Sequence, residues 1–389
     1  METWKRTVYI CAFCVFFMSL GISQVSPILP LYFHEMGLSD TGSIARWSGA
    51  SMGITFLIVC LAAPFWGRLA DRKGRKITLI RSSLGMAICS ILLGFQTTPE
   101  GVFLVRTLQG LVSGFYSASV TLVASETPQS HTGWALGIIG SFSLAGSLAG
   151  PLVGGYLSDV VGIRNDFFII GALMLISFGL TAMLVHENYV PKPLVEKQTF
   201  RNLKTHLPEF SSLSATSFLY AISVTAISPI MTVYIKGMLP SNTENIAFIS
   251  GAVFSAMGIA QFFSSSPLGK LVDRIGPRKV LIYSMIYVGL LNIPQAYVDS
   301  VYVLGFIRFL QGFGLGGMLP ALNTYLASKT PKEYTGQVFS YNQSCLFMGY
   351  FLGSFGGSIV AAQFGFITLF WACSLTFIGA ALWVALKLK

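Results

Sequence analysis

Charge is scarce in this sequence. Only 10% of its 389 residues are Asp, Glu, Lys or Arg, whereas 53% are hydrophobic, and the mean hydropathy is +0.68. A chain with so few polar side chains cannot cover a water-soluble core of this size. We therefore expect a protein that resides in a lipid bilayer.

Motifs for enzyme chemistry are also missing. The chain has no Gly-x4-Gly-Lys-Ser/Thr loop for nucleotide phosphates and no His-Glu-x-x-His zinc motif. All six cysteines fall within apolar stretches, and Cys11-x-x-Cys14 lacks the strand-to-helix setting of a redox pair, so we interpret them as buried apolar residues. The sequence predicts a protein that is not an enzyme, with no metal and no cofactor.

Apolar stretches of about 20 residues, the length that crosses a bilayer as a helix, recur along the chain. Because these stretches are longer than barrel strands, we predict an all-α membrane protein with twelve transmembrane helices. The expected spans are 7–34, 45–66, 77–97, 101–124, 134–158, 165–186, 210–235, 246–268, 280–298, 301–326, 336–361 and 366–386.

The sequence repeats itself at an offset of 202 residues. The fold prediction is therefore two pseudo-symmetric six-helix bundles, 1–186 and 210–389, and secondary transporters bind substrates where such repeats meet. The matching segments are Gly67-Arg-Leu-Ala-Asp71-Arg72 with Gly269-Lys-Leu-Val-Asp273-Arg274, Pro27 with Pro229, Tyr32 with Tyr234, Arg106-x-x-Gln109-Gly110 with Arg308-x-x-Gln311-Gly312, and Gly154-Gly155 with Gly356-Gly357.

Residues 187–209 interrupt the hydrophobicity and form the predicted cytoplasmic linker between the bundles. Apolar and basic residues alternate here at helical spacing, with Phe200 and Leu203 opposite Arg201 and Lys204. Two interpretations stay open, a short amphipathic helix against anionic lipid and a solvated tether.

The net charge of +10 could indicate a nucleic-acid partner, but the basic residues are sorted by loop. The termini and alternate loops carry 19 of the 25 Lys and Arg residues, whereas the opposite loops carry only Arg46, Arg164 and Lys236. The positive-inside rule then places both termini and the linker in the cytoplasm, with the bilayer rather than nucleic acid as partner. Three arginines remain within or at the edge of spans: Arg81, Arg106 and Arg308.

A loop of the form Gly-x-x-x-Asp-Arg-x-Gly-Arg-Lys, at residues 67–76, joins spans two and three. Its glycines permit tight turns and close approach, its cations anchor it at the inner surface, and Asp71 needs a specific partner. With its copy in the second half, the loop resembles that of the major facilitator superfamily, and the resemblance covers essentially the whole chain. It implies that Asp71 lies near the N-terminus of helix eleven, and Asp273 near helix five, bracing one conformation. Alternatively, these charges only fix topology.

Eight residues are the predicted conformational gate. Glu126 ends span four within reach of the basic loop, so we interpret it as a partner of Arg72 or Arg75 rather than as a proton carrier. The set consists of Gly67, Asp71, Arg72, Gly74, Arg75, Asp273, Arg274 and Glu126.

Span five contains Gly146-x-x-x-Gly150-Pro151-x-x-Gly154-Gly155. Glycines four residues apart let another helix approach closely, and Pro151 permits a bend, which predicts a hinge-like contact surface. The pattern resembles the fifth-helix signature of superfamily antiporters. Leu20-Gly21-x5-Pro27-Ile-Leu-Pro30 resembles the first-helix signature of the twelve-helix drug:proton antiporters. Together, the resemblances imply export in exchange for protons.

Polar residues recur on one face of spans four and ten, including Arg106 with Gln109 and Arg308 with Gln311. A mid-span arginine costs about 2.5–3.5 kcal/mol on insertion scales, so we expect each to line a wet cavity or to meet a partner. The resemblance implies a role in proton coupling for Arg106. Arg308 could instead bond backbone carbonyls or a terminal carboxylate. Further cavity candidates are Gln24, Tyr234 and Asn342.

The acidic residues Glu35, Glu126, Asp159 and Asp299 all lie near span ends. A cationic compound would therefore lack a counter-ion in the middle of the membrane. We expect a neutral or anionic substrate, with the two arginines of spans four and ten as counter-ions.

The leading functional prediction is proton-coupled efflux of small amphiphilic, drug-like compounds by alternating access at the cell membrane. Second comes export of an endogenous anionic metabolite, such as a polycarboxylate siderophore. A third alternative, of another class, is a non-transporting ligand sensor or scaffold. The expected partners are a small-molecule substrate, protons and the lipid bilayer, without nucleic acid, and the protein is expected to be a monomer.

Overall fold

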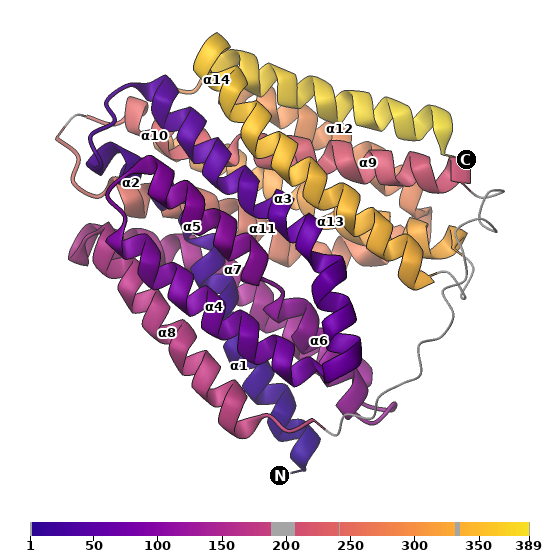
Figure 1. Cartoon of the computed structure of the whole chain (residues 1–389). Coiled ribbons are helices and arrows are strands. Elements are labelled where there is room, and N and C mark those ends of the chain that lie inside the picture. The colour runs from indigo at the N-terminus through magenta and orange to yellow at the C-terminus, as the bar shows by residue number, and fades with distance from the viewer. Residues whose placement is uncertain (1, 188–206, 241, 331–334, 389) are drawn as a thin grey trace. The chain divides into compact units, whose positions relative to one another are not determined.

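The computed structural model describes residues 2–187, 207–240, 242–330 and 335–388, and the elements in these ranges are helices (Figure 1). Most of the predicted linker lies outside the described residues, so both interpretations of it stay predictions. Its last three residues, 207–209, already belong to the first helix of the second half.

In the described residues, the first half contains eight helices and the second contains six helices and one 3-10 turn. The first half contains α1 (Thr3–Ser23), α2 (Val25–Glu35), α3 (Thr41–Lys73), α4 (Arg75–Phe95), α5 (Pro99–Val112), α6 (Phe115–Glu126), α7 (Thr132–Val161) and α8 (Ile163–Leu184). The second contains α9 (Leu207–Ala226), η2 (Ser228–Ile230), α10 (Met231–Met238), α11 (Ile246–Ile275), α12 (Pro277–Gln295), α13 (Val301–Lys329) and α14 (Thr335–Lys387).

These helices correspond to the twelve predicted spans, which confirms the all-α prediction. Three spans are interrupted: α1 continues into α2, α5 into α6, and α9 into α10. Helix α14 contains two spans that join at Gly365, where a φ of 83° lies in the left-handed region that glycine adopts without strain. Nine helical stretches of the described residues are long and apolar enough to cross a membrane.

The chain packs into two compact units. Unit 1 comprises residues 1–36, 57–196 and 244–251, and unit 2 comprises residues 37–56, 197–243 and 252–389. Each unit differs from the predicted bundle by one short segment of the other half, residues 244–251 in unit 1 and residues 37–56 in unit 2. The first part of α3 packs within unit 2, and the start of α11 packs within unit 1.

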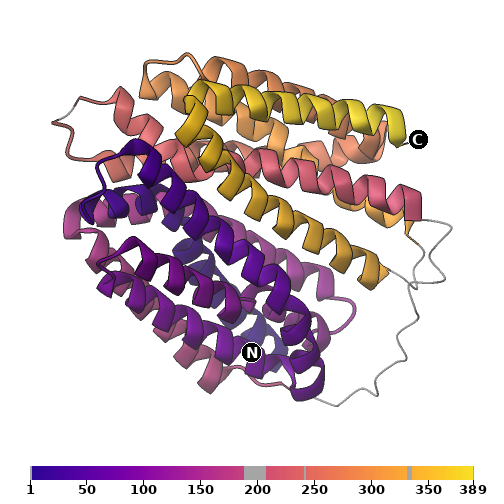
Figure 2. The same ribbon diagram turned by 45° about the horizontal axis from the view of Figure 1, so that its top comes forward.

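In unit 1, α1 packs along α7 and α4 packs along α8 (Figure 2). The glycine stripe of span five forms the contact between α7 and α1. A Cβ atom at Gly146 would overlap the carbonyl oxygen of Phe16, and one at Gly150 would overlap that of Leu20. Two helices approach this closely only where a side chain is absent. Pro151 lies inside an uninterrupted α7, and the hinge role of this segment stays a prediction.

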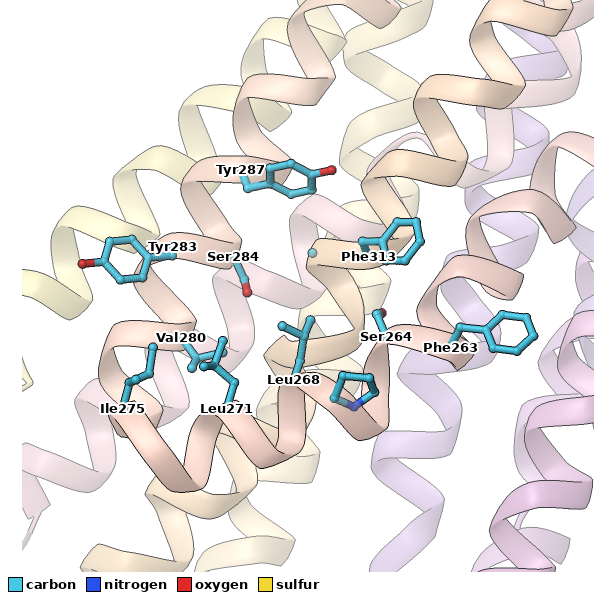
Figure 3. A pocket seen from close by; sticks show the side chains of 12 residues that line it. Phe263, Ser264, Leu268, Leu271, Ile275, Val280, Tyr283, Ser284, Tyr287 and Phe313 are labelled. Carbon is cyan, nitrogen blue, oxygen red and sulfur yellow. The ribbon is translucent and has the colours of Figure 1, made fainter.

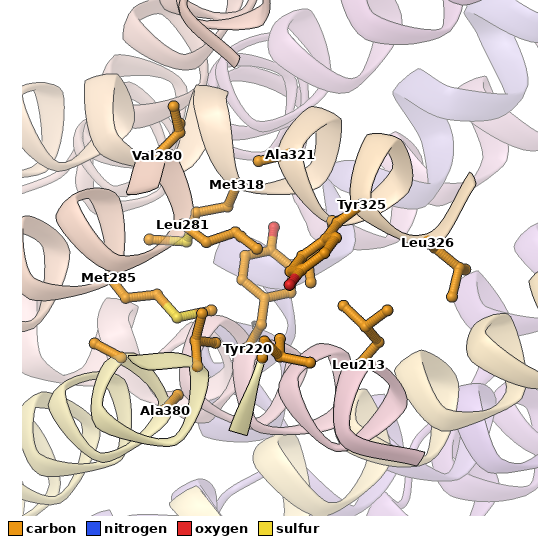
Figure 4. Close-up of a cluster of buried hydrophobic side chains, with 14 of the residues drawn as sticks. Leu213, Tyr220, Val280, Leu281, Met285, Met318, Ala321, Tyr325, Leu326 and Ala380 are labelled. Atoms are coloured by element: carbon orange, nitrogen blue, oxygen red, sulfur yellow. The ribbon is translucent and has the colours of Figure 1, made fainter. Parts of the chain in front are cut away.

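In unit 2, α9 packs along α14. Here a second glycine stripe makes the contact, because Cβ atoms at Gly353 and Gly357 would overlap groups on α9. The core of the unit is apolar: Leu281 of α12, Met318 of α13 and Tyr220 of α9 belong to one buried cluster (Figure 4). Dispersion contacts in this cluster hold the helices together, since lipid removes most of the hydrophobic drive between them.

Each half contains the same tyrosine anchor between its first and third spans. The hydroxyl of Tyr32 donates to the carbonyl oxygen of Leu93 at 2.7 Å, and that of Tyr234 donates to the carbonyl oxygen of Gln295 at 2.7 Å. Donors and acceptors both stand at the predicted offset of 202 residues. Each hydroxyl donates to a carbonyl in the last turn of a helix, where fewer backbone N–H donors are available than in the middle of the helix.

The repeat shifts by one residue in its last two spans. Gly154 faces Gln24, and Gly357 faces Ala226, which lies 202 residues after Gln24. Gly154 therefore corresponds to Gly357 rather than to Gly356, and the predicted match of these glycines was wrong by one residue. An additional residue ahead of span eleven accounts for the shift, and packing rather than sequence register fixes the correspondence.

We expect Gly150→Ala to destabilise the protein by about 1–3 kcal/mol, because its methyl group would overlap the backbone of α1. Gly140→Ala, on the same helix, is the matched control, since no atom lies within 4 Å of its Cβ position. Thermal unfolding of the purified variants in detergent measures the difference. Equal melting temperatures for the two variants would contradict the close contact.

Candidate transport site

Arg106 is a buried residue of α5, the helix that begins with Thr98 as its N-cap and Pro99 at its first position. Its side chain is 5% exposed and donates from Nη1 to Oε1 of Gln109, one turn further along, at 2.5 Å. A buried guanidinium requires hydrogen bonds, because apolar surroundings do not solvate its charge. The structure thus brings this predicted pair together within unit 1.

Arg308 occupies the corresponding place on α13 but has different neighbours. It is 7% exposed, and its Nη1 lies 3.5 Å from the sulfur of Met257, a weak acceptor. Its Nε and Nη2 atoms are buried and have no hydrogen-bond partner among the described residues. A backbone carbonyl partner, the alternative expected from the sequence, is not seen in this part of the chain. Two nitrogens of this buried cation, Nε and Nη2, can therefore still donate a hydrogen bond to an acceptor.

Gln311, one turn beyond Arg308, belongs to a buried amide network. Its Nε2 donates to Oδ1 of Asn292 at 2.9 Å, and Nε2 of Gln295 donates to its Oε1 at 3.3 Å. Asn292 and Gln295 lie on α12 and are fully or nearly fully buried. Neither residue was predicted as a site residue, because both stand in an apolar span. Their spacing of three residues, which puts both on one helix face, was the available signal.

Gln24 and Asn342 are buried polar side chains, one in each unit. Gln24 lies at the junction of α1 and α2, and neither amide atom has a hydrogen-bond partner in the described structure. Asn342, on α14, is 4% exposed, and its Oδ1 also lacks one there. Leaving such a group unsatisfied costs about 1–3 kcal/mol, so both side chains are suited to bind a polar group that enters the protein.

Tyr234 has a packing role. Its hydroxyl is committed to the Gln295 carbonyl, and its ring lies against Phe366 and Phe370, with centroid distances of 5.2 Å to each. Tyr234 was predicted to line the cavity. An aromatic residue in an apolar span can either line a cavity or pack against other helices, and the contacts seen here are those of packing.

Asp166 is a buried carboxylate that the sequence analysis missed. It lies near the start of α8, is 0% exposed, and accepts a hydrogen bond from the hydroxyl of Ser158 at 3.4 Å. Its Oδ1 atom has no partner among the described residues. Its place four residues into a span resembles that of an ordinary end charge, which is why position alone did not reveal its burial.

The two repeated loops end alike. Gly74 precedes α4 and Gly276 precedes α12, with φ angles of 91° and 90°. This left-handed conformation explains the glycine at both positions. Gly67 is different: it lies inside α3, and no atom comes within 4 Å of its Cβ position. The tight turn and close approach expected at Gly67 are therefore absent.

Glu187 caps α4. Its Oε1 accepts from the backbone N–H of Arg75 at 2.9 Å, and its Oε2 accepts from that of Lys76 at 2.8 Å. Nη1 of Arg75 also lies 3.8 Å from Glu187 Oε1. A carboxylate at a helix N-terminus satisfies free N–H groups and interacts favourably with the helix dipole. This contact with the basic loop was not predicted, because Glu187 was assigned to the linker.

The other predicted gate residues keep their status as predictions. Glu126 ends α6 and is half-buried, and Arg72, Asp273 and Arg274 are exposed. The side chain of Asp71 lies outside the described residues.

Comparison with known proteins identifies the family. The model of the Major Facilitator Superfamily matches residues 11–234 and 213–389. Multidrug resistance protein MdtG of Proteus mirabilis is 40% identical over 374 residues, which cover 95% of this chain and 92% of that protein. MdtG of Klebsiella pneumoniae is also 40% identical, over 94% of this chain and 90% of that protein. The chain belongs to the major facilitator superfamily.

Solved structures of superfamily transporters share this fold. The nucleoside transporter NupG has a TM-score of 0.82 at 15% identity, with full coverage of both chains. The human organic anion transporter MFSD10 has a TM-score of 0.70 at 16% identity, over 99% of this chain and 100% of that one. At such low identity the likeness concerns the fold alone. The protein is thus a multi-pass membrane protein of a transporter family and not an enzyme.

This superfamily member interrupts its fourth span. Helix α5 ends at Val112, α6 begins at Phe115, and Gly114 between them has a φ of 120°. The interruption frees backbone carbonyls, which must be satisfied inside a membrane. Nε1 of Trp66 donates to the Leu111 carbonyl at 2.7 Å, and Nη2 of Arg81 donates to the Ser113 carbonyl at 3.0 Å.

Arg81 also stacks on Trp66, with its guanidinium carbon 3.5 Å from the ring centroid. This cation–π contact orders both donors against the interruption. We refer to Trp66 and Arg81 together as the span-four clamp.

We expect Arg81→Gln to lower the free energy of unfolding by about 1–3 kcal/mol, because it removes the bond to Ser113 and the stacking on Trp66. Arg68→Gln, at an exposed position of α3, is the charge-matched control. Chemical denaturation in detergent, followed by tryptophan fluorescence, measures both variants. A wild-type midpoint for Arg81→Gln would show that the clamp contributes nothing.

Proposed function

We propose that the protein exports small amphiphilic compounds in exchange for protons, as a multidrug-type secondary transporter that works by alternating access. The observation that carries this proposal is the identity of about 40% with proteins named multidrug resistance protein MdtG, over more than 90% of this chain and of each relative. The first-span and fifth-span patterns, which resemble those of drug:proton antiporters, support the same direction of transport and the same coupling ion.

The proposed substrate and coupling residues lie on spans one, four, ten and eleven: Arg106, Gln109, Arg308, Gln311, Gln24 and Asn342. Their burial in apolar units supports this assignment. So do the polar atoms of Gln24, Arg308 and Asn342 that lack partners among the described residues. A polar group of a transported compound, or water that accompanies it, would supply the missing hydrogen bonds.

Two contacts, one in each unit, support a conformational gate. In unit 1, the Asp159 carboxylate accepts from the N–H groups of Ala247 and Phe248 at the start of α11, at 3.3 and 2.8 Å. In unit 2, Gly49 of α3 packs against Ser358 of α14. Both contacts tie the first turns of a long helix to one unit while the rest of that helix belongs to the other. We assign to them, with the basic loops, the alternate opening and closing of the transporter.

The placement in the cell follows from the charge distribution. The two six-helix bundles, 1–186 and 210–389, would cross the cell membrane with both termini and the linker in the cytoplasm, where the positive-inside rule places the basic loops. The proposed transport unit is a monomer.

An anionic metabolite is the second candidate substrate. Arg308 favours it, because two buried nitrogens of this cation, Nε and Nη2, have no acceptor among the described residues. A carboxylate would accept from both in the bidentate arrangement that arginine prefers.

We expect purified protein in sealed liposomes to accumulate an amphiphilic dye when a pH gradient is imposed, since exchange against protons uses that gradient. Cationic, neutral and anionic dyes of similar size, compared in the same assay, report the preferred charge. Dye binding without gradient-driven accumulation would overturn the transport proposal in favour of a ligand sensor or scaffold.

Arg308→Gln should reduce transport of the anionic dye by about tenfold relative to the neutral dye, because it removes a charge-assisted hydrogen bond. Lys329→Gln, at the end of the same helix, is the control for loss of one positive charge. Equal losses for the two dyes would assign Arg308 a structural role and remove the support for an anionic substrate.

A further inference from the structure

Unit 2 contains an apolar pocket of about 540 Å³ between α11, α12 and α13. Leu268 of α11 projects toward its middle, with Val280 of α12 on one side and Phe313 of α13 on another (Figure 3). This volume is within the range of about 300–1,000 Å³ that is typical of ligand pockets. None of the twelve lining residues is charged, so the pocket suits an apolar ligand.

The pocket opens at the protein surface. Phe263 and Tyr283, at its rim, are 66% and 64% exposed, and Tyr287 is 39% exposed. An apolar rim of this kind on a membrane-spanning helix faces acyl chains rather than water. A hydrocarbon chain from the bilayer is therefore the apolar molecule that meets the opening.

The repeat relates this pocket to the span-four clamp of the first half. Leu268 and Tyr283 lie 202 residues after Trp66 and Arg81, the two residues of the span-four clamp. In unit 1 those side chains stack on each other and donate hydrogen bonds to carbonyls of span four. In unit 2, helix α13 is continuous, and smaller or differently directed side chains line a pocket at the corresponding place.

Basic residues neighbour one end of the pocket in sequence. The lining residues Leu271, Ile275 and Val280 lie where α11 ends and α12 begins. The exposed cations Lys270, Arg274 and Lys279 neighbour them in sequence, and Asp273 is the one exposed anion of the segment 270–280. A basic cluster beside an apolar chain site complements an anionic phospholipid, whose phosphate and acyl chain are joined in one molecule.

We propose that this pocket, with Lys270, Arg274 and Lys279 at its rim, is a binding site for an anionic phospholipid. One acyl chain lies between α11, α12 and α13, and the headgroup phosphate lies against the basic cluster. The transfer of an acyl chain from bilayer to protein changes little in hydrophobic free energy, so selectivity for this lipid comes from its charge.

The test uses photoreactive phosphatidylglycerol with a diazirine in its acyl chain, and a phosphatidylcholine probe of the same chain. Both are incorporated in nanodiscs with the purified wild-type protein, and labelled peptides are mapped by mass spectrometry. We expect phosphatidylglycerol to label 263–287 more strongly than the lipid-exposed face of α8, and unlabelled phosphatidylglycerol to compete. Labelling spread evenly over the exposed helices, or competition by a transported dye instead of by phosphatidylglycerol, would overturn the proposal.

Two variants separate the chain site from the headgroup site. Leu268→Trp, which introduces the residue of the first half, should fill the pocket and reduce labelling of 263–287 to the level of α8, whereas Leu375→Trp, at an exposed position of α14, should not. Lys270→Gln, Arg274→Gln and Lys279→Gln combined should lower the preference for phosphatidylglycerol over phosphatidylcholine by at least about fivefold. An unchanged preference in the triple variant would contradict the role of the cations. This readout needs no transport activity, so it holds or fails independently of the proposed function.

Discussion

The need to satisfy polar groups inside an apolar membrane unit governs this structure. Three arginines show how differently it is met. Arg81 has two carbonyl acceptors and an indole ring, and Arg106 has the amide of Gln109. Arg308, which is just as buried as Arg106, has a methionine sulfur and two nitrogens without acceptors in the described part of the chain. Of these three arginines, Arg308 has the fewest acceptors within the described protein, so it is the one best suited to bind an acceptor group of a transported compound.

The repeat explains which features belong to the fold and which belong to one half. The tyrosine anchors and the glycine stripes occur in both halves, because each half must hold its first span close to its third and fifth. In the described residues, span four is interrupted whereas α13 is continuous, and the amide network around Gln311 and the pocket around Leu268 lie in the second half. Duplication provides the framework, and these departures give the two halves different chemistry.

Much of the fold follows from the sequence because apolar length and repetition are long-range signals. The predicted ends of the twelve spans agree with the helices to within four residues, except that α3 and α11 continue seven residues further. The anchor at Tyr234 occurs at the offset that the repeat requires. Local geometry was harder to predict from the sequence. The break at Gly114 depends on donors from Trp66 and Arg81, which are distant in sequence. The burial of Asp166 and Asn292 depends on which helix face meets a neighbour, and the insertion before span eleven is visible only through packing.

Transport as proposed requires that water and transported compounds reach the Arg308 position. Its most direct test is the reactivity of Arg308→Cys, in a protein whose six native cysteines are replaced, towards a membrane-impermeant methanethiosulfonate reagent. We expect modification by this polar reagent and a slower reaction when substrate is present. Reaction with a lipophilic maleimide alone, unaffected by substrate, would place the position in lipid or sealed protein and contradict a role of Arg308 in transport.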